Sequence, residues 1–138
     1  MKVKNWMTPS PLTLTEDDIV KTAVTHVLRN RIRHIPILRG GTLVGIVTDR
    51  DLKRALPSVV AGSSPEEYQS FMDSTKLRDV MSANPMTCGP ESDMLEVVRL
   101  FVENKFGAIP VLEDERIVGI ITQTDAMQAF LQQLAADS

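Results

Sequence analysis

Apolar residues recur along this chain with two spacings, and the same order of spacings occurs twice. A helical spacing of three or four positions runs through residues 19–28 and again through residues 94–102, which predicts an amphipathic helix in each stretch. Two short runs rich in β-branched residues follow the first helix, at 35–38 and 43–48, and predict strands. Gly40-Gly41 lies between these runs and predicts a tight hairpin turn.

Polar residues at the ends of the two helices predict their caps. Asp17 or Asp18 is expected to cap the first helix and Ser92 the second, because their side-chain oxygens can accept from unpaired backbone N–H groups. Asn30 and Asn104 occupy the same late position, where asparagine tolerates the left-handed conformation of a C-cap.

A duplication explains the recurrence. Residues 2–56 aligned on residues 76–130, an offset of 74, give 15 identities at 55 positions, where composition alone gives roughly 3. The identities are spread along the whole unit, so the copy is structural. In the second copy Asp114-Glu115 replaces the glycine turn, and a last helix is expected to begin near Asp49 and near Gln123. Each copy thus predicts a β-α-β-β-α unit.

The fold class that follows is α+β, with the two units packed about a pseudo-twofold axis. One unit of ~55 residues is marginal alone, and nearly continuous apolar strands require cover on both faces of a sheet. Repeat 1 is placed at 1–56, the linker at 57–75 and repeat 2, with a C-terminal helix, at 76–138. A short helix is expected in the linker, with Ser64 as N-cap and Pro65 in the first turn.

Charge and composition limit the classes of function that the chain can have. The net charge is -3, but 10 Lys/Arg stand against 5 Asp/Glu through Leu56, and 5 against 13 afterwards. The overall acidity disfavours a nucleic-acid binder, whereas the basic first half could hold a small anion. Cys88 is the only cysteine, which suits a reducing cytosol, and neither a signal peptide nor a membrane span is expected.

Few residues offer catalytic or metal chemistry. The chain has two histidines and no His-x-x-His pattern, no Walker loop, no dinucleotide fingerprint and no nucleophile elbow. We therefore expect a cytoplasmic protein that is not an enzyme, with no metal, no required cofactor and no membrane partner.

Thr48-x-x-Asp51 and its copy Thr122-x-x-Asp125 form the sharpest motif. In one interpretation the motif is a capping box, with threonine at the N-cap and the carboxylate three residues later. In the other, the same helix start receives a phosphate, and the aspartate accepts from the adjacent hydroxyls of a ribose. The motif alone does not decide between them.

The ordered, duplicated set resembles a tandem pair of CBS domains, also called a Bateman module. Ile35-Pro36 and Ile109-Pro110 each precede a Val-Gly-Ile-hydrophobic-Thr-x-x-Asp run, and the first run, 44–51, is similar to bacterial members of the family. The long linker resembles the free-standing, acetoin-utilisation-type proteins of that family. The resemblance implies two clefts between the repeats, each holding an adenine nucleotide or adenosyl compound such as AMP, ADP, ATP or S-adenosylmethionine.

Carried onto this chain, the resemblance implies two sets of ligand-binding residues. The first cleft would use Thr122 and Asp125 with Met7, Leu12, Ile32 and His34; the second would use Thr48 and Asp51 with Met81, Met86, Phe106 and Ala108.

Substitutions between the copies make these clefts unequal. Arg33 and His34 would serve phosphates in the first cleft, and Arg50, with Lys53, in the second. Their counterparts in the other copy are Gly107, Ala108, Thr124 and Met127. Arg50 could equally be a solvated charge, and His34 a satisfied, half-buried residue.

The resemblance favours a regulatory module that senses an adenine-containing ligand and signals to a protein partner not identified by the sequence. Homodimerisation is expected, with Val59, Val60, Phe71 and Met72 of the linker as contributors. An interaction scaffold with vestigial clefts remains the alternative, and nucleic-acid binding through the basic half is a weaker third.

Overall fold

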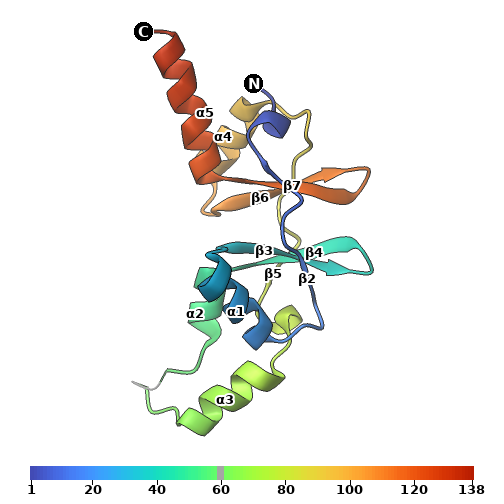
Figure 1. The fold of residues 1–138 in the computed structure, drawn as a ribbon, viewed down its shortest axis with the longest axis vertical. Coiled ribbons are helices and arrows are strands. Elements are labelled where there is room, and N and C mark those ends of the chain that lie inside the picture. Colours follow the sequence, from blue (N-terminus) through green and yellow to red (C-terminus); the bar gives the residue numbers. More distant parts are fainter. Residues whose placement is uncertain (59–60) are drawn as a thin grey trace. The chain divides into compact units, whose positions relative to one another are not determined.

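The computed structural model describes residues 1–58 and 61–138 and confirms an α+β chain with a duplicated β-α-β-β-α order (Figure 1). The helices are α1 (Val20–Asn30), α2 (Asp49–Ala55), α3 (Pro65–Ser74), α4 (Met94–Glu103) and α5 (Gln123–Ala136). The strands are β1 (Thr8–Pro9), β2 (Leu14–Thr15), β3 (His34–Arg39), β4 (Thr42–Thr48), β5 (Ser82–Ala83), β6 (Ala108–Glu113) and β7 (Arg116–Thr122). Short 3₁₀ turns, η1 (Val3–Asn5) and η2 (Leu77–Asp79), precede β1 and β5.

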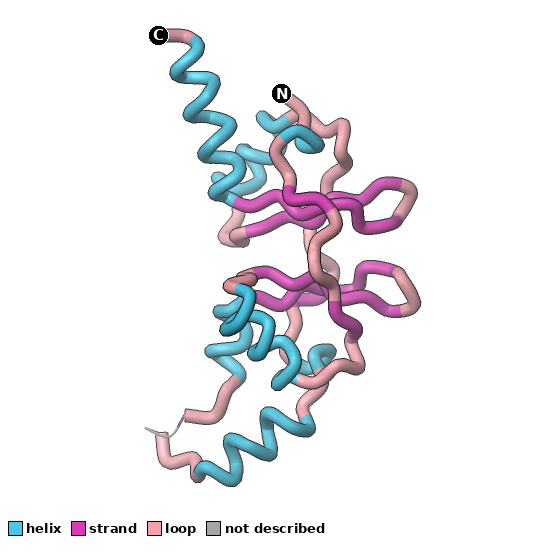
Figure 2. Tube along the Cα trace, viewed as in Figure 1, coloured by secondary structure: helices cyan, strands magenta, loops and turns pink. Residues whose placement is uncertain are grey.

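Both predicted hairpins are present (Figure 2). Gly40 and Gly41 join β3 to β4 with φ angles of 55° and 84°, so both lie in the left-handed region that a tight hairpin turn requires. Asp114 and Glu115 do the same between β6 and β7, with φ angles of 51° and 65°. The second turn therefore keeps the geometry of the first without its glycines.

The chain forms two compact units, and each contains the first residues of the other repeat. These exchanged segments are Met1–Pro11 in one unit and residues 76–84 in the other. The α4–α5 unit comprises Met1–Pro11 and Pro85–Ser138, and the α1–α2 unit comprises Leu12–Asn84. Accordingly β1 pairs antiparallel with β7 in the sheet β1-β7-β6, and β5 pairs antiparallel with β4 in the sheet β2-β3-β4-β5. The compact units thus divide the chain differently from the repeats seen in the sequence.

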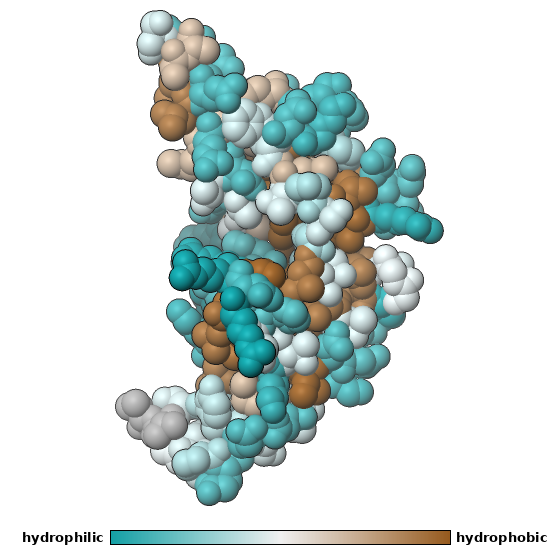
Figure 3. Space-filling model, in the orientation of Figure 1, coloured by the Kyte–Doolittle hydropathy of each residue, from teal (hydrophilic) through white to brown (hydrophobic). Residues whose placement is uncertain are grey.

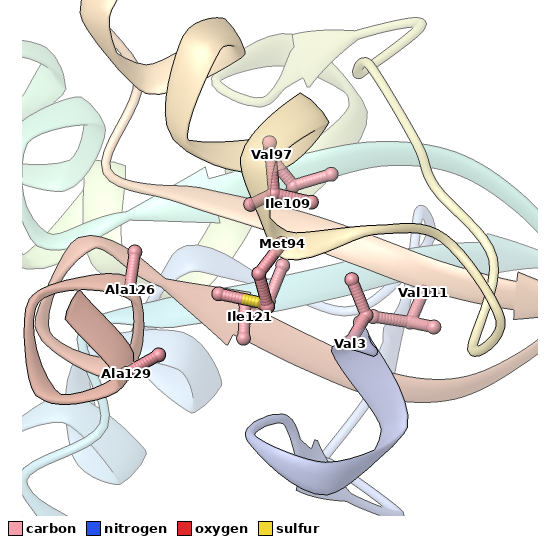
Figure 4. Packing of buried hydrophobic residues seen from close by; sticks show 8 residues of the cluster. All are labelled: Val3, Met94, Val97, Ile109, Val111, Ile121, Ala126 and Ala129. Carbon is pink, nitrogen blue, oxygen red and sulfur yellow. The ribbon is translucent and has the colours of Figure 1, made fainter. Parts of the chain in front are cut away.

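Each unit has its own hydrophobic core, to which the exchanged segment contributes a fully buried side chain. In the α4–α5 unit Val3 lies beside Met94, Val111 and Ile121 (Figure 4). In the α1–α2 unit Leu77 takes the equivalent place in a core of seven buried residues: Val20, Ala23, Ile35, Ile37, Val47, Leu52 and Leu77. A unit without its exchanged segment would therefore have a hole in its core.

The predicted caps of the first repeat helix are wrong. The residue before α1 is Ile19, which makes no side-chain cap. Asp18 instead stabilises the turn that precedes the helix, where its carboxylate accepts from the Thr15 N–H at 2.8 Å. The left-handed residue at the C-terminus is Arg31, with φ 54°, and Asn30 is still helical.

The caps of the second repeat helix also differ from the prediction. Asp93 is the N-cap of α4 and accepts from the Leu95 N–H at 3.0 Å, while the Ser92 hydroxyl accepts from the Gly89 N–H at 2.9 Å. Asn104 is extended, with φ −130°, and its side chain donates to the Leu100 carbonyl. In both repeats several polar residues lie within reach of the helix end, so spacing alone did not identify the one that caps it.

The predicted linker helix is confirmed as α3. Ser64 accepts from the Glu67 N–H at 3.1 Å, and Pro65 is the first helical residue. Phe71 and Met72, predicted to help a dimer, are partly buried against the core of the α1–α2 unit, and their part in a dimer stays a prediction. Val59 and Val60, named in the same prediction, lie outside the described residues.

Candidate functional site

The two Thr-x-x-Asp motifs lie at equivalent strand-to-helix junctions. Thr48 ends β4 and caps α2, and Thr122 ends β7 and caps α5. In each, the threonine Oγ1 accepts from the aspartate N–H at 3.1 Å. One carboxylate oxygen of the aspartate accepts from the threonine N–H, at 3.0 Å for Asp51 and 2.9 Å for Asp125. The capping-box interpretation is therefore confirmed at both positions.

The capping box uses only part of the hydrogen-bond acceptor capacity of each aspartate. An ionised carboxylate offers about four acceptor positions, and the box uses one of them, on Oδ2. Over residues 1–58 and 61–138 no hydrogen bond to the Oδ1 atom of either Asp51 or Asp125 is found, and both side chains are half-buried. Each junction thus presents a carboxylate, held in position by the helix start, that can still accept from a vicinal diol.

A methionine of the exchanged segment packs on the glycine of each motif strand. A Cβ atom built on Gly119 would lie 2.4 Å from Met7 Sδ, and one built on Gly45 would lie 2.4 Å from Met81 Sδ. The strand pairs Pro9↔Gly119 and Ala83↔Gly45 hold these contacts. The structure therefore brings Met7 into the unit of Asp125, and Met81 into the unit of Asp51, as the predicted site sets require.

The remaining predicted residues are divided between the units. Leu12, Ile32, Arg33, His34 and Arg50 belong to the α1–α2 unit with Asp51, whereas Met86, Phe106 and Ala108 belong to the α4–α5 unit with Asp125. Each predicted cleft draws on both units, so the two sets of residues stay a prediction.

Within the α1–α2 unit, the basic residues cluster at the Asp51 junction. His34 is paired with Thr48 across β3 and β4, and the Arg33 carbonyl accepts from the Asp49 N–H at 3.0 Å. Arg50 is the next residue and is exposed. This end of the unit therefore combines two guanidinium groups, an imidazole and the motif itself.

At the equivalent end of the α4–α5 unit, Gly107, Ala108 and Thr124 replace Arg33, His34 and Arg50. Ala108 is paired with Thr122, and the Gly107 carbonyl accepts from the Gln123 N–H at 3.1 Å. The Gln123 side chain donates to the Phe106 carbonyl at 3.1 Å. The two junctions share backbone geometry and differ in electrostatics.

Burial lowers the pKa of His34 from its ordinary value of 6.5. Asp49 and Asp51 oppose the shift and Arg33 adds to it, but burial is the largest cause. A lowered pKa leaves the imidazole mostly neutral near pH 7, so His34 carries little positive charge there. Positive charge for a phosphate would come from the guanidinium groups of Arg33 and Arg50.

The sequence interpretation overlooked the packing role of Gly45 and Gly119. The signal was present, because a glycine matched in both copies inside a strand marks a close approach of another group. Gln123 was overlooked as well, and its contact with the Phe106 carbonyl had no signal in the spacing.

The comparisons with known proteins identify the family. The CBS domain model matches residues 3–58 and 77–132. The chain therefore belongs to the CBS domain family and carries two copies of the domain. In the part of the chain that the structure describes, no helix is long and apolar enough to cross a membrane.

Relatives of the same size are known. The chain is 29% identical over 134 residues to a CBS domain-containing protein of Dictyostelium discoideum, covering 96% of this chain and 92% of that one. It spans about half the length of other curated relatives, 46% and 56% of two of them.

Solved structures give the same fold. The Vibrio cholerae protein AcuB is 30% identical with a TM-score of 0.77, covering 100% of this chain and 97% of that one. CBSX2, from Arabidopsis thaliana and solved in complex with AMP, is 28% identical with a TM-score of 0.79, covering 95% and 97%. The predicted likeness to AcuB-type CBS pairs is confirmed.

Proposed function

We propose that this chain is a non-catalytic regulatory module that binds an adenine nucleotide, with AMP as the first candidate. The observation that carries the proposal is the pair of Thr-x-x-Asp junctions, each with an aspartate oxygen still able to accept from a ribose. The likeness to CBSX2, which was solved with AMP, supports the adenine ligand. ADP, ATP and S-adenosylmethionine are the other candidates.

The expected affinity suits a metabolite sensor. AMP has about 23 non-hydrogen atoms, and at about −0.3 kcal/mol per atom its binding free energy is about −7 kcal/mol. This free energy corresponds to a Kd of roughly 10 µM. Binding would favour whichever arrangement of the repeats holds the ligand better, and a partner protein in the cytoplasm would respond to that arrangement.

The two junctions are proposed to bind unequally. Arg33 and His34 would serve phosphates in the cleft of Asp125, and Arg50 would serve them in the cleft of Asp51, where Gly107 and Ala108 take the positions aligned with Arg33 and His34. Phosphates gain from charge-assisted bonds to guanidinium groups. We expect nucleotides with two or three phosphates to distinguish the two sites more strongly than AMP does.

Thermal unfolding with AMP, ADP, ATP and S-adenosylmethionine tests the proposal. A ligand that binds only the folded chain raises the midpoint progressively with its concentration. Adenine-free ribose 5-phosphate is the control that should give little shift. No shift with any adenine compound would favour the scaffold alternative, in which the junctions serve only as helix caps.

We also propose that the chain works as a homodimer. Exposed apolar side chains on α1, α4 and α5 support this proposal. Sedimentation of the purified chain tests this separately from ligand binding, and a monomer at every concentration would overturn it.

A further inference from the structure

The α1–α2 unit carries a cluster of exposed cations that repeat 2 does not share. Residues 29–54 have 7 Lys/Arg against 2 Asp/Glu, whereas the aligned residues 103–128 have 2 against 5. Six of these cations, all exposed, lie at the end of α1, in the segment after it and on α2, and together we call them the basic surface: Arg29, Arg31, Arg33, Arg50, Lys53 and Arg54. The space-filling view shows strongly hydrophilic side chains over α1 (Figure 3).

The fold brings the basic surface together from two elements. The Arg33 carbonyl accepts from the Asp49 N–H at 3.0 Å, which joins the segment after α1 to the start of α2, and the two helices also pack beside each other. Within α2, Arg50 lies three residues before Lys53 and four before Arg54, a spacing that makes helical side chains neighbours. The six cations therefore lie close together on one unit.

The chain does not neutralise the basic surface internally. Over residues 1–58 and 61–138, no ion pair joins any of its six cations to a carboxylate. The two nearby acidic side chains have local hydrogen bonds instead, since Asp49 accepts from the Arg50 N–H at 3.0 Å and Asp51 accepts within the capping box. The positive charge of the surface is therefore available to a partner.

Two of the six arginine and lysine positions do not help the helices that carry them. Arg31 has φ 54°, in the left-handed region that glycine or asparagine adopts at lower cost. Arg50 is the second residue of α2, where the helix dipole disfavours a positive charge, and repeat 2 has the neutral Thr124 at the aligned position. Helix stability therefore does not account for arginine at either position, which favours a role in binding.

The chemistry of the basic surface favours an acidic protein segment as its partner. Five of the six cations are arginines, whose guanidinium groups pair with carboxylates through two hydrogen bonds and are enriched in protein interfaces. Residues 29–54 contain no Phe, Tyr or Trp on which the bases of a single-stranded nucleic acid could stack, and the net charge of -3 disfavours a nucleic acid further. Leu28, 76% exposed, precedes Arg29, and one apolar side chain suits a protein segment better than a membrane, which requires a wide apolar face.

We propose that the basic surface docks an acidic segment of a partner protein, with carboxylates on its arginines and an apolar side chain on Leu28. This inference rests on the proposed regulatory function for its role, because it supplies the contact through which a partner responds. Arg29, Arg31 and Arg54 lie outside both predicted sets of ligand-binding residues. Docking can therefore be tested without substituting any residue of those sets.

The test is fluorescence anisotropy with a labelled peptide built from Glu-Glu-Leu repeats, measured without nucleotide. The triple variant Arg29→Gln/Arg31→Gly/Arg54→Gln should raise the Kd for this peptide at least about tenfold, because three charge pairs are lost. Binding to the parent chain should weaken as salt screens the charges, and a peptide of Gln-Gln-Leu repeats should not bind. A parent chain that binds both peptides equally, or neither, overturns the docking surface.

A matched control removes the same number of charges from repeat 2. Arg99→Gln/Lys105→Gln/Arg116→Gln replaces three exposed cations and gives the chain the same net charge as the first triple variant. Its Kd for the acidic peptide should stay within about twofold of the parent value, because exposed charges beyond a Debye length are largely screened. An equal loss in both triple variants would show that the peptide responds to total charge, and would overturn the basic surface as its site.

Arg31→Gly alone separates binding from stability. Its urea midpoint should equal or exceed that of the parent, because glycine adopts the left-handed conformation without strain, while its Kd for the acidic peptide rises. A lower midpoint with an unchanged Kd would overturn the assignment of Arg31 to the surface.

Two further measurements distinguish the partner and the underlying function. Tighter binding of a labelled oligothymidine than of the acidic peptide would overturn the acidic-protein partner. The thermal shift with AMP is measured separately on the parent and on the first triple variant, and should be the same in both. Failure of peptide binding therefore overturns the docking surface alone, and failure of AMP binding overturns the proposed function alone.

Discussion

Asp51 and Asp125 each serve the fold with one carboxylate oxygen, and over residues 1–58 and 61–138 the other oxygen accepts no hydrogen bond. A substitution by alanine would remove both roles together, and loss of a helix cap costs about 0.5–2 kcal/mol. Asparagine separates them, because its carbonyl oxygen can still accept from the threonine N–H while the charge is lost.

We therefore predict that Asp51→Asn and Asp125→Asn each change the free energy of unfolding by less than about 1 kcal/mol. At the affected site the affinity for AMP should fall about tenfold to a hundredfold, because a bond to a charged group is worth about 1.5–3 kcal/mol. Calorimetric titration and urea unfolding measure the two effects. Glu113→Gln, at an exposed strand end, is the control. Unchanged affinity in both single variants would contradict the ribose assignment.

His34 makes stability depend on pH. Its folded pKa lies below 6.5 because the imidazole is buried. The unfolded chain therefore takes up the proton first as the pH falls below about 6.5, and folding free energy is lost from there down through the folded pKa. Above that range both states are neutral and the contribution is complete.

His34→Gln should reduce this loss. Urea unfolding between about pH 8 and about pH 5 should show a smaller drop in stability for the variant than for the parent chain. His26→Gln, on α1, controls for removing a histidine elsewhere. An equal drop in His34→Gln and parent would show that other groups dominate acid sensitivity.

At the scale of elements, two-residue strands decide how each unit is completed. β1 on β7 and β5 on β4 are too short to be seen as periodic patterns, and their pairing depends on a glycine that admits a methionine. A Cβ on Gly119 would also lie 3.0 Å from Met7 Cγ and 3.1 Å from the Thr8 carbonyl oxygen. The backbone oxygen cannot move without disturbing the strand pair.

Gly119→Ala should therefore destabilise the α4–α5 unit by about 1–3 kcal/mol, the usual cost of overpacking. Met7→Ala in the same chain should recover part of that loss, since the two residues are in contact and their effects couple. Gly89→Ala is a matched control, because its nearest neighbours would be 3.7 Å from the new Cβ. Urea unfolding of the parent, Gly119→Ala, Met7→Ala and the double variant measures the coupling, and purely additive effects would contradict the contact.

At the scale of the whole molecule, the exchange of segments means that a sequence repeat and a compact unit comprise different residues. A fragment ending at residue 58 holds most of the α1–α2 unit but lacks Leu77, which is fully buried in that core. Removing a buried leucine side chain alone costs about 2–5 kcal/mol. Such a loss is comparable with the whole stability of a small unit.

We predict that the fragment 12–84 unfolds cooperatively in urea, whereas the fragment 1–58 does not. Circular dichroism through the titration measures this. Leu77→Ala in the fragment 12–84 is the control that should remove most of its stability. Cooperative unfolding of the fragment 1–58 would show that the exchanged segment is dispensable.

The sequence by itself determined the local elements and the motif. Helical and β-branched spacings predicted α1, α4 and the two hairpins, and Ser64-Pro65 predicted α3, because these signals lie within a few residues of each other. The duplication then allowed each element predicted in one repeat to be predicted in the other, including the second Thr-x-x-Asp junction. The helix caps were missed where neighbouring polar residues competed for one helix end.

Only the tertiary structure decided which segments complete which unit. Val3 and Leu77 are ordinary apolar residues in the sequence, and nothing near them shows that they belong to the core built by the other repeat. Burial likewise decides that His34 is mostly neutral near pH 7. Cores, burial and pKa shifts depend on residues distant in the chain, and local spacing carries no information about them.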